Sequence, residues 1–180
     1  MIEYKLLFTG TTGAGKTTAI NVISDTPTIS TEVENFDSAY DKETTTVGFD
    51  FGEVMLAEEC MLRLYGTPGQ DRFDFMWQIL IEDALGLVIL IDNSRPDPLA
   101  DLTTYLEGFA SELQAIPCVI GVGRQEQHQQ PTLDDYCDHL EKFGHSLPVI
   151  PVDVREVEDV RLLLELLVAQ IEAEASFAGC

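Results

Sequence analysis

The residues best suited to chemistry stand near the start of the chain, in the segment Gly10-Thr11-Thr12-Gly13-Ala14-Gly15-Lys16-Thr17. They fill every position of the pattern G-x-x-x-x-G-K-[ST], in which backbone amides surround phosphate groups. An apolar run over 2–8 precedes the segment and a helical pattern follows it, so the expected context of strand, loop and helix is present. A glycine-rich turn that binds nothing is the alternative, and the complete match in this context makes it the weaker one.

Each residue type in this segment has an expected role. Glycines let the backbone curl around phosphate oxygens, and the helix that begins near Lys16 directs the positive end of its dipole at the same anion. Lys16 is expected to reach the β- and γ-phosphates, and the hydroxyl of Thr17 to bind Mg²⁺. The sequence therefore predicts a nucleoside triphosphate site. Its loop residues are Gly10, Gly13, Ala14, Gly15, Lys16, Thr17 and Thr18.

Apolar runs and helical patterns alternate along the chain. Strand-like runs cover 2–8, 47–57, 60–65, 85–91, 117–122 and 147–152, and helical patterns cover 16–24, 72–81, 99–114, 133–142 and 157–175. This alternation predicts one three-layer, doubly wound α/β domain over 1–180, with a mostly parallel six-stranded sheet. Only Glu58 and Glu59 separate the second and third runs, which predicts an antiparallel hairpin at one edge.

Ligands of such sheets bind at the carboxyl ends of the strands, where this chain places several cations. Four of its six arginines, Arg72, Arg95, Arg124 and Arg155, fall at or near that end. The chain is otherwise strongly acidic, with a formal net charge of -22 over 180 residues. Cations gathered there favour an anion site.

The composition also excludes several classes of function. Such an acidic surface repels DNA, RNA and anionic lipid, so no nucleic-acid partner is expected. No stretch approaches the roughly 20 apolar residues of a membrane span. The N-terminus has no basic region followed by an apolar one, and the four cysteines share no close spacing. A reducing, cytoplasmic setting is therefore expected.

These features together resemble the small Ras-like GTPases, over nearly the whole length of the chain. The segment Thr67-Pro68-Gly69-Gln70 resembles in particular the bacterial MglA branch, which acts in gliding motility and cell polarity. The resemblance implies that Thr46 binds Mg²⁺ and the γ-phosphate, as the second metal ligand beside Thr17. It implies that the N–H of Gly69 binds the γ-phosphate and that Gln70 is the catalytic residue that orients the attacking water. It also assigns nucleotide-binding roles to Arg124, Glu126, Val154 and Arg155.

Two of these roles have plainer alternatives. Thr46 closes a run of three threonines that also suits the start of a β-branched strand. Gln70 also suits the N-terminus of a helix. Position and flanking sequence favour the functional interpretation of both.

The chain departs from the family pattern at three places. Gly66 stands where the family has an Asp that supports the Mg²⁺ shell, and the sequence leaves open whether Asp50, Asp92 or no acid replaces it. The guanine-reading motif Asn-Lys-x-Asp is replaced by Gly123-Arg124-Gln125-Glu126, in which Arg124 can stack on a purine and Glu126 can accept from guanine. GTP therefore stays ahead of ATP.

The third departure concerns an arginine finger. No arginine lies between Thr18 and Leu62, so the first switch, interpreted as residues 25–46, contains no arginine finger. Lys42 and Arg72 are the remaining candidates. Turnover is then expected to be slow, because such a contact accelerates hydrolysis by roughly 10³–10⁵.

The leading hypothesis is a GTP-dependent switch with bound Mg²⁺ and GTP or GDP. The resemblance implies an activating partner of the roadblock type, an effector protein, and a role in motility, pili or polarity. The polar stretch 25–46 is interpreted as the first switch, with Phe36 and Tyr40 either anchoring a partner or pinning the loop. The alternatives are an ATP-binding kinase of a small molecule and a scaffold that does not hydrolyse its nucleotide.

Overall fold

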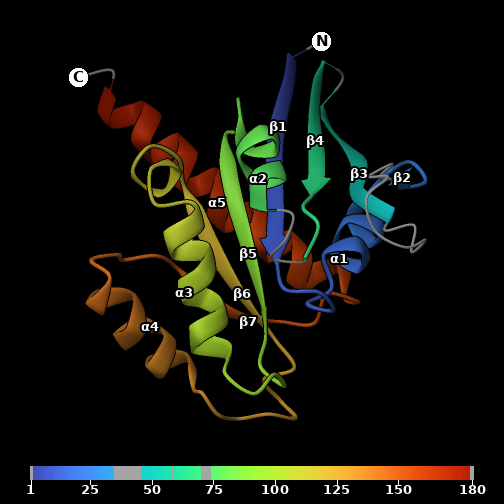
Figure 1. Cartoon of the computed structure of the whole chain (residues 1–180). Helices are drawn as coiled ribbons and strands as arrows, with labels where there is room; N and C mark the ends of the chain where they lie inside the picture. Colours follow the sequence, from blue (N-terminus) through green and yellow to red (C-terminus); the bar gives the residue numbers. More distant parts are fainter. Residues whose placement is uncertain (1, 35–45, 58, 70–73, 179–180) are drawn as a thin grey trace.

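The computed structural model describes residues 2–34, 46–57, 59–69 and 74–178. Its centre is a seven-stranded sheet in the order β2-β3-β4-β1-β5-β6-β7 (Figure 1). β3 is antiparallel to both of its neighbours, and the pairs β1–β4, β1–β5, β5–β6 and β6–β7 are parallel. The strands are β1 (Ile2–Gly10), β2 (Ile29–Glu34), β3 (Thr46–Ala57), β4 (Cys60–Gly66), β5 (Gly86–Asp92), β6 (Cys118–Gly123) and β7 (Val149–Val152).

Helices cover both faces of this sheet, as Figure 1 shows. One face carries α1 and α5, which also contact each other, and the other face carries α2, α3 and α4. The helices are α1 (Lys16–Ile23), α2 (Asp74–Ile81), α3 (Pro98–Gly108), η2 (Glu112–Gln114), α4 (Leu133–Lys142) and α5 (Val157–Ala178). The predicted three-layer α/β class with a mostly parallel sheet is therefore confirmed.

The alternation of side chains along β5 explains why two separate cores form. All seven of its residues are buried, and successive side chains point to opposite faces of the sheet. Leu87, Ile89 and Ile91 pack with α2, α3 and α4, whereas Val88 and Leu90 pack with α1 and α5. Burial on both faces is the property expected of a central parallel strand. Both faces of β5 therefore belong to the hydrophobic core.

The structure differs from the expected elements in one part of the sheet. β2 lies within the polar stretch that was interpreted wholly as a loop, and it forms the edge beyond β3. The sequence of β2, Ile-Ser-Thr-Glu-Val-Glu, has too few apolar residues to be recognised as a strand. Its strand conformation is stabilised by backbone pairing with β3 rather than by apolar side chains of its own. Among the described residues, no helix has both the length and the apolar composition that a membrane crossing requires.

Candidate functional site

The phosphate-binding pattern forms a tight loop between the end of β1 and the start of α1. Gly15 caps α1 in a left-handed conformation with φ of 95°, which glycine adopts without a steric cost. A Cβ at this position would lie 2.5 Å from Cγ2 of Val154, so the loop also requires glycine for its close approach to the segment after β7. The Ala14 N–H donates to the carbonyl of Thr11 at 3.1 Å and closes the turn. The loop therefore has the strand–loop–helix geometry that the pattern needs.

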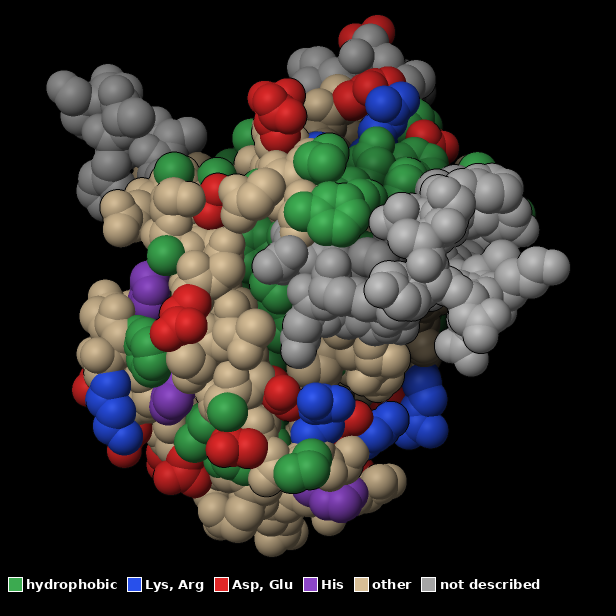
Figure 2. Space-filling view, in the orientation of Figure 1, with side chains coloured by type: hydrophobic (Ala, Val, Ile, Leu, Met, Phe, Trp, Pro, Cys, Tyr) green, Lys and Arg blue, Asp and Glu red, His purple; other side chains and the backbone are tan. Residues whose placement is uncertain are grey.

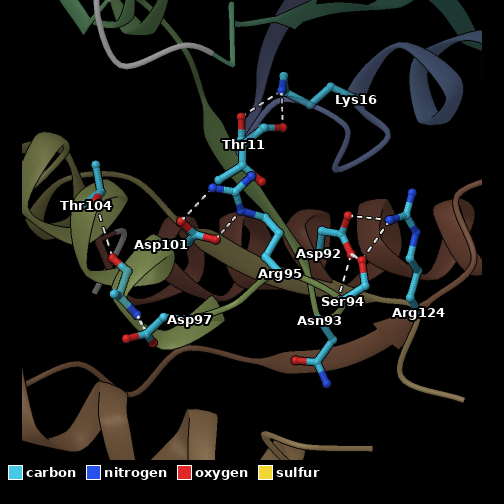
Figure 3. Close-up of polar contacts among 12 residues, drawn as sticks. Thr11, Lys16, Asp92, Asn93, Ser94, Arg95, Asp97, Asp101, Thr104 and Arg124 are labelled. Atoms are coloured by element: carbon cyan, nitrogen blue, oxygen red, sulfur yellow. Dashed lines mark hydrogen bonds and ion pairs between the residues drawn. The ribbon is translucent and has the colours of Figure 1, made fainter. Parts of the chain in front are cut away.

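Lys16 lies against the inside of this loop. Its Nζ donates to the carbonyl oxygens of Gly10 at 2.7 Å and Thr11 at 2.9 Å (Figure 3), and the residue is only 7% exposed. Burial lowers the pKa of Lys16 to about 8, and the nearby carboxylate of Asp50 opposes that shift. No ion pair is formed by Lys16 within the described part of the chain. A buried cation held only by neutral carbonyls has much to gain from a phosphate group.

The side chain of Asp50 lies next to Gly66, the position at which small Ras-like GTPases have an Asp. Asp50 on β3 pairs with Gly66 on β4, and a Cβ built on Gly66 would lie 3.1 Å from both Cβ and Oδ2 of Asp50. The Thr17 hydroxyl donates to Asp50 Oδ2 at 2.5 Å. Thr17 is exposed and Asp50 is partly exposed, so these oxygens remain accessible. The geometry favours Asp50 over Asp92 as the replacement acid.

Asp92 is engaged elsewhere, at the carboxyl end of β5. Its Oδ2 accepts from Arg124 Nη1 at 2.6 Å, and its Oδ1 accepts from both the N–H and the hydroxyl of Ser94 (Figure 3). Asp92 pairs in register with Gly123, just as Asp50 pairs with Gly66. At both places a glycine occupies the motif position and an aspartate lies opposite it on the adjacent strand.

The segment after β4 folds back onto the phosphate loop. The Thr67 N–H donates to the carbonyl of Phe8 at 2.8 Å, and the Thr12 N–H donates to the carbonyl of Gly69 at 3.2 Å. A Cβ on Gly69 would lie 2.5 Å from the Thr12 nitrogen and 2.8 Å from Nζ of Lys16. Gly69 is thus beside the ammonium that is expected to bind the terminal phosphate. A side chain at this position would collide with the loop.

The loop after β6 carries the expected base-reading residues. Arg124 has φ of 60°, and besides Asp92 its Nη1 contacts the Ser94 hydroxyl at 2.9 Å. The side chain remains half exposed at 51% and is accessible to solvent. Glu126 is exposed. Arg124 therefore has a fixed orientation that the sequence did not predict.

Asn93, the residue directly after β5, braces this loop. Its Nδ2 donates to the carbonyls of His128 at 2.6 Å and Pro131 at 3.0 Å and to Oε1 of Gln125 at 2.9 Å. Its Oδ1 accepts from the hydroxyl of Tyr136 at 2.7 Å, and the residue is only 2% exposed. Sequence reasoning missed Asn93. Its one signal was its place directly after a buried strand, where polar residues reach the ligand edge of the sheet.

The segment after β7 completes the site from the other side. Val154 approaches the phosphate loop at Gly15. Arg155 is 74% exposed, and its guanidinium and N–H donate to Asp153 at 2.5 to 3.0 Å. These bonds lower the pKa of Asp153 to about 2. The loops after β1, β4, β6 and β7 therefore all lie at one end of the sheet.

Figure 2 shows Lys and Arg side chains in the lower half of this face, below the level at which β1 and β4 end in Figure 1, with Asp and Glu side chains among them. Six residues that the sequence analysis singled out cannot be compared with this arrangement. Thr46 begins β3 and its backbone pairs with Glu34, but its side chain lies outside the described residues. Gln70 also lies outside them, together with Arg72, Phe36, Tyr40 and Lys42.

Comparison with known proteins identifies the family. Residues 28–172 match the family described as "Conserved hypothetical ATP binding protein". The chain belongs to this family. The matched residues begin after the phosphate loop, which covers residues 10–17. The phosphate-binding pattern is therefore evidence independent of the family match.

Individual proteins resemble this family member over most of their length at low identity. ADP-ribosylation factor-like protein 3 of Saccharomyces cerevisiae is 21% identical over 177 residues, which cover 94% of this chain and 86% of that protein. Ras-related protein Rab-7L1 of Rattus norvegicus is 22% identical, with 93% and 81% covered. Intraflagellar transport protein 22 homolog of Xenopus tropicalis is 26% identical, with 86% and 85% covered. The chain is therefore similar to small GTPases of the Ras superfamily.

Proposed function

We propose that this protein is a GTP-binding molecular switch that hydrolyses its nucleotide slowly. The observation that carries the proposal is the placement of Lys16. Its ammonium lies within the phosphate loop and beside Gly69, the residue expected to sense the γ-phosphate. A cation held by the loop and placed beside the segment after β4 is positioned so that one phosphate group could contact both and change the position of that segment. Similarity to small GTPases adds independent support.

Bound Mg²⁺ belongs to this proposal, and the side chains of the site fit the ion. Thr17 Oγ1 and the carboxylate of Asp50 are hard oxygen donors, which suit Mg²⁺ better than nitrogen or sulfur does. Thr17 would bind the ion and Asp50 would orient water on it, and Thr46 would be the second protein ligand. The ion would supply neutralisation of the phosphate charge.

Recognition of guanine is assigned to the loops after β6 and β7. Glu126 would accept from the two N–H groups on the Watson–Crick edge of guanine, and Arg124 would stack on the ring. Val154 and Arg155 would close the same side. Asn93 supports this assignment, because its four hydrogen bonds hold the loop in one conformation without the family Asn at position 123.

Hydrolysis and signalling complete the proposal. Gln70 would orient the attacking water, and residues 25–46 would be the first switch. The resemblance to the MglA branch supports a cytoplasmic role in motility, pili or polarity, with an effector and an activating partner of the roadblock type. Phosphate release from GTP, with and without such a partner, tests this part. Release that requires a small-molecule phosphate acceptor would instead favour a kinase.

ATP binding is the second candidate, and one observation favours it. The family carries the description of an ATP-binding protein, and Gly123 lacks the amide of a guanine-reading Asn. Identification of the nucleotide that copurifies with the chain, followed by competition between GTP and ATP, decides between the two. ATP bound at least as tightly as GTP would reject the proposal of a guanine switch.

A further inference from the structure

A cavity of about 290 Å³ lies beside the phosphate loop, on the side of the α3 helix. Thr11 and Thr12 of the loop line it together with Gly69 from the segment after β4. Arg95 and Asp101 form part of the opposite wall. Because Gly69 adjoins Nζ of Lys16, and the carbonyl of Thr11 accepts a hydrogen bond from it, this cavity opens next to the place where the terminal phosphate is expected.

Arg95 is held in a fixed direction within this wall. It follows β5 in a turn in which its N–H donates to the carbonyl of Asp92 at 3.2 Å. Its Nε and Nη2 donate to the two carboxylate oxygens of Asp101 at 2.5 and 3.3 Å, an ion pair with the first turn of α3. Figure 3 shows the guanidinium pointing from this pair toward Thr11 and the phosphate loop. A bidentate pair of this kind orients the planar fork as well as attracting it.

Hydrogen-bonding capacity remains on both sides of the cavity. Asp101 occupies Nε and Nη2 of Arg95, and Nη1 has no hydrogen bond to any described residue. On the opposite wall, the hydroxyl oxygen of Thr11 is buried without a partner among the described residues. The two other described arginines at this end are committed elsewhere, Arg124 to Asp92 and Arg155 to Asp153.

We propose that Arg95 is a catalytic arginine supplied by the chain itself, whose free Nη1 donates to γ-phosphoryl oxygens of the bound triphosphate. The inference rests on the proposed GTP-binding function. It locates the arginine finger in the loop after β5. The first switch, the segment 25–46, contains no arginine that could serve. An activating partner would then order the site rather than provide an arginine.

The reaction explains why a cation is useful at this position. A water oxygen bonds to the γ-phosphorus, the bond from that phosphorus to the bridging oxygen breaks, and its electron pair stays on the bridging oxygen of the diphosphate. The water proton leaves with inorganic phosphate or to solvent. Negative charge is redistributed over the transferring group and the bridging oxygen in the transition state, where a preoriented guanidinium stabilises it.

The test is single-turnover hydrolysis by the full-length chain loaded with GTP and Mg²⁺, without any partner. The parent is expected to hydrolyse at about 10⁻² s⁻¹, the magnitude associated with an arginine in cis. Arg95→Ala and Arg95→Lys are expected to be slower by a factor on the order of 10³, because neither offers the fork. Asp101→Asn, which keeps the cavity but weakens the pair, should fall between them and the parent. Arg161→Ala, which removes an exposed arginine on α5, is the matched control and should equal the parent.

Binding measurements separate a catalytic role from a structural one. The affinity of Arg95→Ala for GDP should stay within about twofold of the parent's, because the contact forms on the terminal phosphate alone. The parent should bind GDP with tetrafluoroaluminate, a mimic of the transferring group, and Arg95→Ala should not. Three results would overturn this inference without affecting the proposed function. Arg95→Ala could hydrolyse GTP at the parent's rate, or a parent that binds GTP could fail to hydrolyse it. Arg95→Ala could also lose GDP affinity by the same factor as its hydrolysis rate. A parent that binds no GTP would instead overturn the proposed function itself.

Discussion

Asp50 and Gly66 lie opposite each other on β3 and β4, and the carboxylate of Asp50 fills the space beside Gly66 in which an aspartate side chain would have stood. A carboxylate is thus present at this place in the site, and it comes from the adjacent strand. In the proposed function it is the acid that would support the metal shell. Its oxygen is 2.5 Å from the hydroxyl of Thr17. The two residues explain how a chain without the family Asp can still offer oxygen donors beside the phosphate loop.

Asp50→Ala is expected to weaken the Mg²⁺-dependent part of nucleotide affinity. Loss of a residue that orients a metal shell typically lowers metal affinity by about 10–100-fold. Titration of Mg²⁺ into the GDP complex, followed by a fluorescent nucleotide, measures the effect directly. Glu53→Ala is the control, because Glu53 is another carboxylate on β3, paired with Arg63.

The double variant Asp50→Gly, Gly66→Asp exchanges the two side chains across the ladder. If the position of the carboxylate is what matters, the exchange should restore most of the Mg²⁺ affinity that Asp50→Ala loses. Equal Mg²⁺ affinity in the parent and in Asp50→Ala would show instead that Asp50 only holds the Thr17 hydroxyl.

Triphosphate affinity is expected to fall as the pH rises above about 8. Burial lowers the pKa of Lys16 to about 8 in the free protein, and an adjacent phosphate favours the charged form and raises that pKa again. Below pH 8 the lysine is charged in both states, so affinity is constant there. Above it, binding must take up a proton, and the affinity should fall about tenfold between pH 7 and pH 9.

Calorimetry at pH 8.5 in two buffers of different ionisation enthalpy measures this proton uptake. Lys16→Ala should abolish triphosphate binding, since it removes the cation from the loop. A pH-independent affinity, with no proton uptake on binding, would mean that Lys16 does not meet the phosphate.

Asn93→Ala is expected to destabilise the fold by about 3 kcal/mol, because it leaves one buried and several partly buried polar groups without this partner. Among them are the hydroxyl of Tyr136 and the carbonyls of His128 and Pro131. Urea denaturation measures the loss. Gln127→Ala changes an exposed side chain of the same loop and should stay within about 0.5 kcal/mol of the parent. A similarly small effect of Asn93→Ala would remove Asn93 as the brace of the base-reading loop.

Much of this arrangement was predictable from the sequence, and the exceptions have a common cause. The phosphate loop and the parallel strands were predicted from the spacing of glycines and apolar residues within short segments, which can be seen directly in a sequence. Asp50 lies on the strand adjacent to the motif position Gly66, and Asn93 directly follows the strand that pairs with the motif position Gly123. Such pairing between distant segments is set by sheet register, which local spacing does not display. The edge strand β2 was missed for a related reason. Its strand conformation depends on backbone pairing with β3, and its own composition does not indicate a strand.

Gln70→Leu is expected to slow hydrolysis while leaving nucleotide affinity nearly unchanged. The glutamine would position water in the transition state and would contact the ground state little. Single-turnover rates of the parent and the variant, with any activating partner present, provide the measurement. A rate equal to the parent's would assign Gln70 an ordinary place at the start of a helix.

The most direct test of the central claim is a calorimetric competition between GTP and ATP for the full-length chain in the presence of Mg²⁺. A carboxylate that accepts from two guanine N–H groups meets an amino group and a ring acceptor in adenine, a mismatch that costs a few kcal/mol. We predict that GTP binds at least about tenfold more tightly than ATP, and that Glu126→Ala removes the difference by weakening GTP alone. Equal displacement by the two nucleotides, or equal loss of both in Glu126→Ala, would contradict a guanine-specific switch.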